Sequence, residues 1–393
     1  MMNTEHSKLA GFSVKKERGV ATLFISLILL AVMSLTAFFA NRTLVIDQEV
    51  AGNYYRANRA QMAAETGLEV VLAQLNTPAR STFINGSGPI AGPHNLSASL
   101  GSTANTFGTL SLSVTLSEMS PTGETASIIG ITSLGCWKES GVGALAACDI
   151  CSSSCPANSE VSQTLVFRGS LAGAPSAPLT AKGNINLNGS AITVTNQDIA
   201  TNGLTIHAGG NVTALSPTSN FTSLPGAPPE ASIASSDDEL STISTDDFFI
   251  KFFGQDKDTY KNSANYQISC GGVCNTSVDG KQGAIIWVDV PQNSSFTLNS
   301  TTVVGSASNP VVLVVNGNLE LRGSATVYGL VYSTSADWDN TGGGSSQIIG
   351  AAVSEGDFEA NGTPNPIYDP GVLSLLASSV GNYYKVPGSW RDF

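Results

Sequence analysis

The sequence predicts an α+β protein in which a long N-terminal helix, beginning as a transmembrane segment, precedes a mainly β ectodomain. The C-terminal half of that ectodomain is expected to be a β-helix or a related solenoid. Three observations support this prediction. Residues 20–40 are apolar and free of charge, a helical pattern continues to about residue 77, and short apolar runs between Gly-Asn pairs recur through the C-terminal half.

The composition excludes several classes of protein. Only 12% of the 393 residues are charged, about half the share that is usual in soluble proteins. With 41% hydrophobic residues, the chain has enough apolar material for a folded core. Eighteen basic residues against 30 acidic ones give a formal net charge of -12, so a nucleic-acid-binding face is not expected.

The apolar run at 20–40 is long enough to cross a membrane. Its 21 residues make a helix of roughly 32 Å. The residues before the run carry four basic side chains against two acidic ones, and positive residues keep that side of a span in the cytoplasm. The rest of the chain is therefore expected outside the cytoplasm. A cleaved secretory signal is the alternative, but its apolar core is shorter and a small-residue cleavage site would follow it.

An amphipathic helical pattern continues this run over 41–77. The segment 41–75 contains no proline, and Pro78 then provides a stop. One helix of about 84 Å is therefore expected over 20–75. Four apolar residues near its end have the i, i+3, i+4 and i+7 spacing of one helix face: Leu68, Val71, Leu72 and Leu75.

The N-terminal segment resembles a known family. A basic leader ends at Gly19 and the apolar run starts directly after it, as in type IV pilins. Three stretches then follow in the order found in the N-terminal region of PilX-type minor pilins: ERGVATL at 17–23, DQEVAGNY at 47–54 and AAETGL at 63–68. The resemblance covers about one sixth of the chain and is specific as an ordered set.

This resemblance implies processing of the N-terminus. A prepilin peptidase would remove the leader, residues 1–19, by cutting between Gly19 and Val20, and Val20 would then carry a methylated amine. Major pilins have a glutamate five residues into the mature chain, whereas this chain has Phe24. In pilins that carboxylate neutralises the terminal amine of a neighbouring subunit. A subunit at the tip has no neighbour above it and does not need the carboxylate. The departure therefore favours a minor or tip-complex subunit over a repeating one.

The resemblance also implies that the helix packs against other minor and major pilins. Small side chains permit a close approach between helices. The residues expected in this contact are Ala57, Ala60, Ala64 and Leu68.

Beyond Pro78 the sequence predicts two β-rich regions. Alternating apolar residues indicate strands near 109–116 and 161–167. The segment around 171–178 is rich in Pro and Ala and is expected to separate a Cys-containing region, 78–170, from a repeat-containing region, 179–393.

The second region carries an internal repeat. The sequence GNINLNGSA at 183–191 is echoed by GNLELRGSA at 317–325, with weaker copies at 210–212 and 356–362. Short strands between Gly-Asn corners are typical of a parallel solenoid, and the apolar rows 311–315 and 327–332 are expected to line its interior. The alternative is an antiparallel sandwich in which Gly-Asn pairs mark hairpin turns.

Six cysteines, all beyond the membrane span, are expected to form disulfides because the exported compartment is oxidising. We expect Cys270 to pair with Cys274, and the other four to pair among themselves. The alternative is a zinc site that combines the Cys-x2-Cys spacing at 148–151 with the Cys-x3-Cys spacing at 270–274. The six are Cys136, Cys148, Cys151, Cys155, Cys270 and Cys274.

Catalytic motifs are largely missing from the sequence. His207 stands in an expected turn, and neither a nucleophile elbow nor a phosphate loop occurs. Asp337 and Asp339 have the spacing of calcium ligands in a loop, although solvated turn acids are the simpler interpretation. No other cofactor and no catalytic residue are expected, so we do not expect an enzyme.

The sequence thus predicts a PilX-like minor pilin that supports pilus initiation or the tip complex and presents a β-rich head, with adhesion as a further expected role. It is expected as a single-pass protein of the inner membrane, and in the pilus at the cell surface after assembly. The alternative is a membrane-anchored β-helix that binds a ligand or acts on carbohydrate. Processing after Gly19 separates the two, because a plain anchor keeps its leader.

Overall fold

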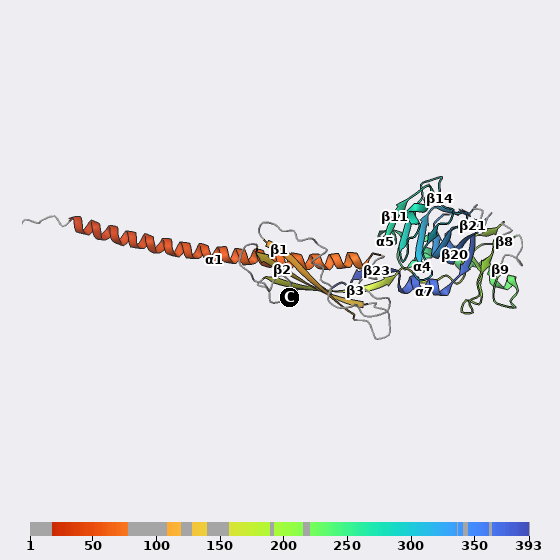
Figure 1. Ribbon diagram of the computed structural model, residues 1–393, viewed down its shortest axis with the longest axis horizontal. Coiled ribbons are helices and arrows are strands. Elements are labelled where there is room, and N and C mark those ends of the chain that lie inside the picture. The colour runs from red at the N-terminus through yellow and green to blue at the C-terminus, as the bar shows by residue number, and fades with distance from the viewer. Residues whose placement is uncertain are drawn as a thin grey trace, which may run out of the picture.

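The computed structural model describes residues 18–77, 108–118, 128–139, 157–188, 192–214, 221–335, 337–340, 345–360 and 364–392. Figure 1 shows three parts along one long axis: helix α1, an antiparallel sheet beside its C-terminal end, and a larger β body beyond that end. This arrangement confirms the predicted class, a long helix followed by a mainly β ectodomain.

Helix α1 runs unbroken over Arg18–Leu75. Its 58 residues correspond to about 87 Å. The last turn closes where the amide of Asn76 donates to the carbonyl of Leu72 and that of Thr77 to the carbonyl of Gln74, each at 3.1 Å. The predicted single helix is therefore present, and it ends just before Pro78.

An antiparallel sheet packs against the C-terminal part of α1. Leu68, Val71 and Leu75 of the helix form one buried cluster with apolar residues of the sheet, among them Ile131 and Leu165. The strands are β1 (Gly108–Glu118), β2 (Ile128–Glu139), β3 (Asn158–Gly169) and β23 (Gly381–Lys385) in that spatial order, and β24 (Arg391–Asp392) also pairs with β3.

The end of the chain corrects the region predicted at 179–393. The strands β23 and β24 leave the repeat-containing region and pair antiparallel with β3, so that Gly381 lies opposite Gly169. Their return covers the free edge of β3 and places Tyr383 in the core beneath the sheet. The solenoid is thus an insertion, residues 170–380, between two neighbouring strands of the first sheet. Its two ends are joined by a hydrogen bond of 2.7 Å from the amide of Ser170 to the carbonyl of Val380.

The inserted body is a parallel solenoid, as the repeat predicts. All of its strand pairs among the described residues are parallel, for example β13 with β16 and β16 with β18, so the hairpin sandwich is excluded. Its largest sheet has the spatial order β10 (Ile233–Ala234), β7 (Ile206–Ala208), β4 (Leu179–Ala181), β20 (Ser346–Ser354), β18 (Thr326–Ser333), β16 (Val311–Asn316), β13 (Ile285–Asp289) and β11 (Tyr266–Ser269).

Shorter strands complete the turns of the solenoid. One further sheet holds β12 (Gly272–Val273), β14 (Ser295–Leu298) and β17 (Asn318–Leu321), and another holds β19 (Asp337–Asn340), β21 (Asp357–Ala360), β5 (Ile185–Leu187) and β8 (Val212–Ala214). The strands β15 (Val303–Val304), β22 (Pro364–Tyr368), β6 (Val194–Thr195) and β9 (Phe221–Thr222) branch from the largest sheet.

The turns do not stack in chain order. The chain enters in the middle of the stack, where β4 pairs with β20, and builds outward through β7 to β10. It then crosses to the opposite end, where β11 begins, and builds back through β13, β16 and β18 to β20. The first and last turns of the insertion therefore lie side by side.

The Gly-Asn repeats occupy one corner of successive turns. The amide of Asn184 donates to the carboxylate of Asp357 at 2.6 Å, and the side-chain oxygen of Asn184 accepts from the amide of Asn211 at 2.9 Å. The copies at 183, 210 and 356 thus hydrogen-bond to one another across neighbouring turns, whereas Asn318 of the copy at 317 donates to Ser295 of β14. This ladder explains why the sequence repeats a short polar side chain directly after glycine.

The largest sheet is buried on both faces. Leu313 and Val315 face the interior of the solenoid, whereas Val312 and Val314 face outward against a layer of helices. The apolar row 311–315 therefore lines the interior only with alternate residues, and the same holds for 327–332. The helical segments are η4 (Pro229–Ser232), α3 (Asp238–Thr242), α4 (Thr245–Phe253), α5 (Lys257–Asn262), α6 (Asn275–Val278) and α7 (Pro370–Ser378).

Candidate assembly site on the N-terminal helix

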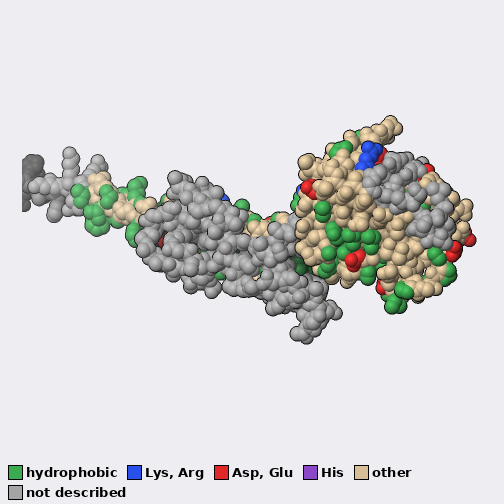
Figure 2. Space-filling view, turned by 45° about the vertical axis from the view of Figure 1, so that its right-hand side comes forward, with side chains coloured by type: hydrophobic (Ala, Val, Ile, Leu, Met, Phe, Trp, Pro, Cys, Tyr) green, Lys and Arg blue, Asp and Glu red, His purple; other side chains and the backbone are tan. Residues whose placement is uncertain are grey.

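The first two thirds of α1 project freely from the rest of the molecule. Among the described residues, α1 is the helix that is long and apolar enough to cross a membrane, and its apolar window is not buried at all within the protein. Large side chains such as Leu30 and Phe38 are 69% and 65% exposed. Figure 2 shows this apolar stretch to the left of the head, while the head surface is mostly uncharged.

The hydroxyl groups within the span are satisfied by the helix itself. Ser26 donates to the carbonyl of Leu23 and Ser34 to the carbonyl of Leu30, both at 2.8 Å. Such bonds to a preceding turn leave no unpaired donor on the helix surface. This segment can therefore lie in hydrocarbon without burying an unsatisfied hydroxyl.

From Ala60 onward, the antiparallel sheet covers one face of α1. Strand β2 crosses α1 at Gly135, where an added Cβ would overlap the carbonyl oxygen of Ala60 and the amide nitrogen of Ala64. A glycine within a strand allows this approach between two backbones. Ala60 and Ala64 of the helix and Gly135 of the sheet thus form one intramolecular contact.

This contact corrects the predicted packing face. Ala60 and Ala64 are completely buried and Leu68 is 5% exposed, all beneath the protein's own sheet. Ala57 alone of the four predicted packing residues is exposed. The reason is that small residues permit close approach by any backbone, and here a strand of the same chain makes that approach.

The predicted processing site lies at the start of the described helix. Gly19 and Val20 both belong to α1, which begins at Arg18. Residues 1–17 and the side chain of Val20 lie outside the described residues. Cleavage between Gly19 and Val20 and methylation of Val20 stay predictions.

Asparagine side chains join the end of α1 to the inserted solenoid. The side chain of Asn76 pairs with both backbone groups of Tyr383, at 2.7 and 3.1 Å. Asn265 donates to the carbonyl of Asn76 at 2.9 Å, and Asn382 donates to the carbonyl of Ser263 at 2.6 Å. These bonds surround a cleft of about 430 Å³ between the helix end, α5 and β23. The solenoid is thereby held in one orientation relative to α1.

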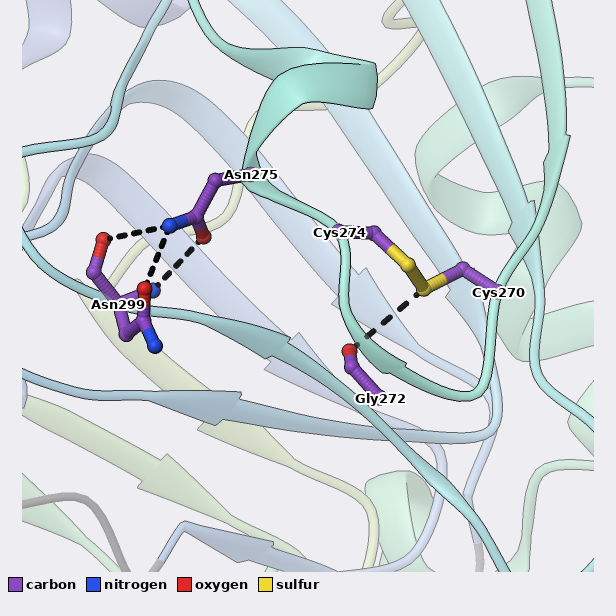
Figure 3. Close-up of a disulfide and its surroundings, with 5 residues drawn as sticks. All are labelled: Cys270, Gly272, Cys274, Asn275 and Asn299. Carbon is purple, nitrogen blue, oxygen red and sulfur yellow. Dashed lines mark hydrogen bonds between the residues drawn. A yellow bond between two sulfur atoms is a disulfide. The ribbon is translucent and has the colours of Figure 1, made fainter.

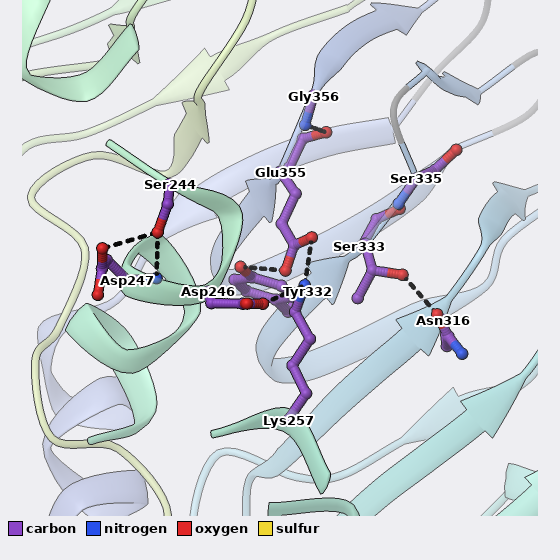
Figure 4. A network of polar contacts seen from close by, with 12 residues as sticks. Ser244, Asp246, Asp247, Lys257, Asn316, Tyr332, Ser333, Ser335, Glu355 and Gly356 are labelled. Carbon is purple, nitrogen blue, oxygen red and sulfur yellow. Dashed lines mark hydrogen bonds and ion pairs between the residues drawn. The ribbon is translucent and has the colours of Figure 1, made fainter. Parts of the chain in front are cut away.

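A partly buried ion pair holds the helical layer on the solenoid (Figure 4). Lys257 at the start of α5 lies 2.9 Å from a carboxylate oxygen of Glu355, and the hydroxyl of Tyr332 donates to the other oxygen at 2.8 Å. Burial raises the pKa of Glu355, while the hydrogen bonds from Lys257 and Tyr332 oppose that rise. Burial likewise raises the pKa of Tyr332 far above its usual range.

The cysteine prediction is confirmed for one pair. Cys270 and Cys274 form a disulfide with a Cα–Cα distance of 6.5 Å. Figure 3 shows it beside the Asn275–Asn299 pair, whose side chains join two turns of the solenoid near its β11 end. Because Cys270 and Cys274 are bonded to each other, the alternative zinc site is wrong. Cys136 is also disulfide-bonded, and Cys148, Cys151 and Cys155 lie outside the described residues.

The described residues show no metal site at the other candidate residues, Asp337, Asp339 and His207. The described residues contain no group of three or more potential metal-ligating side chains. Asp337 and Asp339 lie in β19, with side chains outside the described set, so calcium binding stays a prediction. His207 lies 2.7 Å from Asp237, whose pKa is lowered mainly by this hydrogen bond. Asp237 also caps α3, which is a structural role.

Sequence reasoning missed two residues that shape this region, Gly135 and Asn76. A glycine within the strand pattern of β2 was the available signal for Gly135, since such a glycine can mark a close backbone approach, but Gly130 of the same strand carries the same signal. Asn76 carries no comparable signal, because its partner in β23 lies 307 positions later in the chain.

Comparisons with known proteins agree with the geometry of the helix. Residues 18–69 match the family model described as PilX N-terminal. No curated protein sequence is significantly similar to the chain. Among solved structures, the chain is similar to the competence-associated pilin ComZ from Thermus thermophilus, at 12% identity over 86% of this chain and 97% of that chain, with a TM-score of 0.22. A TM-score this low lies below the level that chains of one overall fold reach, so the comparison that bears on this chain is the match over residues 18–69.

Proposed function

We propose that this protein, whose residues 18–69 form a PilX-type N-terminal region, is a minor pilin-like subunit that supports the initiation of a type IV pilus. The division of α1 is the observation that carries the proposal. Its first part begins with an apolar run and is exposed, whereas the protein's own sheet covers one face of the part from Ala60 onward. A bare apolar helix of this length needs a membrane or other helices around it.

A place in the tip complex is supported by the residue at the fifth mature position. Phe24 offers no carboxylate to a terminal amine, as expected of a subunit with no neighbour above it. In sheared filaments we expect the protein at a small fraction of the major pilin. Near-equal amounts would contradict a minor or tip role.

The inserted solenoid supports a role in display. It lies beyond the C-terminal end of α1, at the opposite end of the molecule from the membrane segment (Figure 1). Its attachment through two adjacent strands, β3 and β23, leaves the smaller sheet complete without it. We therefore assign pilus initiation to α1 with this sheet, and adhesion to the solenoid.

A deletion separates these two roles. In a strain that lacks the protein, the full chain and a variant with residues 171–379 replaced by a short Gly-Ser linker are expressed at matched levels. Both are expected to restore surface pili, and only the full chain is expected to restore attachment to the host surface or substrate. If neither restores pili that the parent strain makes, the assignment to pilus initiation is wrong.

The mass of the mature N-terminus tests the pathway itself. With prepilin peptidase present, we expect a chain that begins at methylated Val20, and without the enzyme a chain that begins at Met1. Gly19→Val serves as the uncleaved control. An intact Met1 start in both strains would indicate a plain membrane anchor instead.

A further inference from the structure

The cleft between the end of α1, α5 and β23 has the size of a ligand site. Its volume of about 430 Å³ lies within the range of about 300–1,000 Å³ that small-molecule sites occupy. Leu72 and Asn76 line it at the end of α1, and the segments 262–265 and 382–385 supply the rest of the lining. One wall therefore belongs to the solenoid, and the other belongs to α1 and its sheet (Figure 1).

Carboxamide side chains hold the walls of the cleft in place. Asn76 pairs with both backbone groups of Tyr383. Asn265 donates to the carbonyl of Asn76 at 2.9 Å and accepts from the amide of Ile285 at 2.8 Å. Because these side chains already have their partners, a ligand would find the cleft formed and would not have to order its walls.

One buried polar atom of the lining lacks a partner. Asn382 is only 5% exposed, and its side-chain amide donates to the carbonyl of Ser263 at 2.6 Å. Its side-chain oxygen is buried and accepts no hydrogen bond from the described residues. Burial of an acceptor without a donor is unfavourable. A donor that enters the cleft would remove this cost, either directly or through one bridging water.

Two further polar groups of the lining are available to a ligand. The side chain of Asn262 is exposed at the end of α5, and Tyr384 is partly buried in β23. Neither the carboxamide of Asn262 nor the hydroxyl of Tyr384 forms a hydrogen bond within the described residues. Both groups can donate and accept. Leu72 and Ala264 add apolar surface to the same cleft.

The lining disfavours other classes of ligand. Its ten described residues include no carboxylate that could hold a cation. Lys385 is the one charged residue among them, and it pairs with Glu69 of α1, so it is not free to bind an anion. A peptide that adds to the sheet would need the backbone groups of Tyr383, which the side chain of Asn76 already occupies. A neutral ligand with several hydroxyl groups fits best.

We propose that this cleft binds a neutral sugar residue, presented by a glycan on the surface to which the protein attaches. The inference rests on the proposed function, since it names the class of ligand for the adhesive role. One hydroxyl of the sugar donates to the side-chain oxygen of Asn382, and others exchange hydrogen bonds with Asn262 and Tyr384. The apolar C–H groups of the sugar ring cover Leu72 and Ala264.

Saturation-transfer NMR tests the class of ligand. The full chain is placed in lipid nanodiscs, because an alkyl-glycoside detergent would compete for the cleft. The probes are the methyl glycosides of galactose, glucose, mannose and N-acetylglucosamine, with sialic acid as the charged comparison. We expect saturation transfer to at least one neutral sugar and less to sialic acid. No transfer to any neutral sugar, or stronger binding of sialic acid, would overturn the proposal.

Two substitutions test whether the sugar lies in this cleft. Asn262→Ala and Tyr384→Phe each remove one hydrogen-bonding group, and each is expected to weaken the affinity for the sugar by about two- to tenfold. Asn58→Ala is the matched control, because Asn58 is also an exposed helical asparagine but lies outside the cleft. Unchanged affinity in both cleft variants would overturn the assignment, and so would an equal loss with Asn58→Ala.

The two proposals fail in different ways, because sugar binding is measured on the isolated chain. If pili assemble normally without the protein, the proposed function is wrong whatever the sugars show. If assembly requires the protein but the chain binds no neutral sugar, the assignment of the cleft is wrong and the role in pilus initiation is unaffected.

Discussion

The crossing of β2 over α1 predicts the cost of one added methyl group. In Gly135→Ala, the new Cβ would overlap the carbonyl oxygen of Ala60 and the amide nitrogen of Ala64, and would lie 2.9 Å from the Cβ of Ala63. Two of these three atoms belong to the helix backbone and have no rotamer through which to move away. The helix must shift from the sheet, and overpacking of this kind costs about 1–3 kcal/mol.

We place Gly135→Ala in the upper part of that range, about 2–3 kcal/mol, because both overlaps are with backbone. If the sheet opens as a local unit, its amides should exchange about 30- to 150-fold faster. Hydrogen exchange followed by mass spectrometry of the full chain in detergent measures this for peptides that span 128–136. Peptides from β16 in the solenoid provide an internal reference that should not change.

Gly52→Ala is the matched control for loss of glycine itself. An added Cβ there meets no atom within 4 Å, and alanine is favoured over glycine inside a helix by about 1 kcal/mol. We therefore expect unchanged exchange in β2 and slower exchange around residue 52. Unchanged or slower exchange of β2 in Gly135→Ala would refute the close contact between β2 and α1.

Three further substitutions test the solenoid, each followed by urea unfolding. Lys257→Met should destabilise the protein by about 2 kcal/mol at pH 7, since a charged hydrogen bond to buried Glu355 is lost. Burial raises the pKa of Glu355, so this loss should shrink as the pH falls and the carboxyl is protonated, beginning above the ordinary range of a glutamate, whereas a constant loss would exclude the ion pair. Cys270→Ser should lower the free energy of unfolding by about 2 kcal/mol, because the disulfide no longer restricts the unfolded chain to a short closed loop. Full stability after chemical reduction would contradict this. Asn184→Ala leaves Asp357 without its side-chain partner at the corner and should cost about 1 kcal/mol, whereas a neutral effect would show that the ladder contributes nothing.

Features set by local sequence were predictable. The helix follows from a charge-free run and a continuing 3.6-residue period, and one disulfide follows from the closeness of Cys270 and Cys274. The corners of the solenoid follow from repeated Gly-Asn and Gly-Asp pairs, three of which place Asn184, Asn211 and Asp357 in hydrogen-bonding contact across neighbouring turns. In each case the information lies within a few residues of the feature.

Features set by distant partners were not predictable. Ala60 and Ala64 have the size needed for close packing, but size does not distinguish a second helix from a strand of the same chain. The row containing Val312 and Val314 is continuously apolar because both faces of its sheet are buried, which removes the alternation that would assign a face. The return of β23 depends on pairing with β3, far earlier in the chain.

The unordered stacking of the solenoid has a consequence for how the protein matures. A chain that is made from its N-terminus presents Asn184 long before Asp357, its partner 173 positions later. Until β20 and β21 are made, β4 and β5 lack the strands with which they pair on one side. High contact order of this kind slows folding and prolongs exposure to aggregation. The solenoid is therefore expected to acquire its native shape only after nearly the whole of residues 170–380 is available, so its yield should depend on protection of the early turns from aggregation.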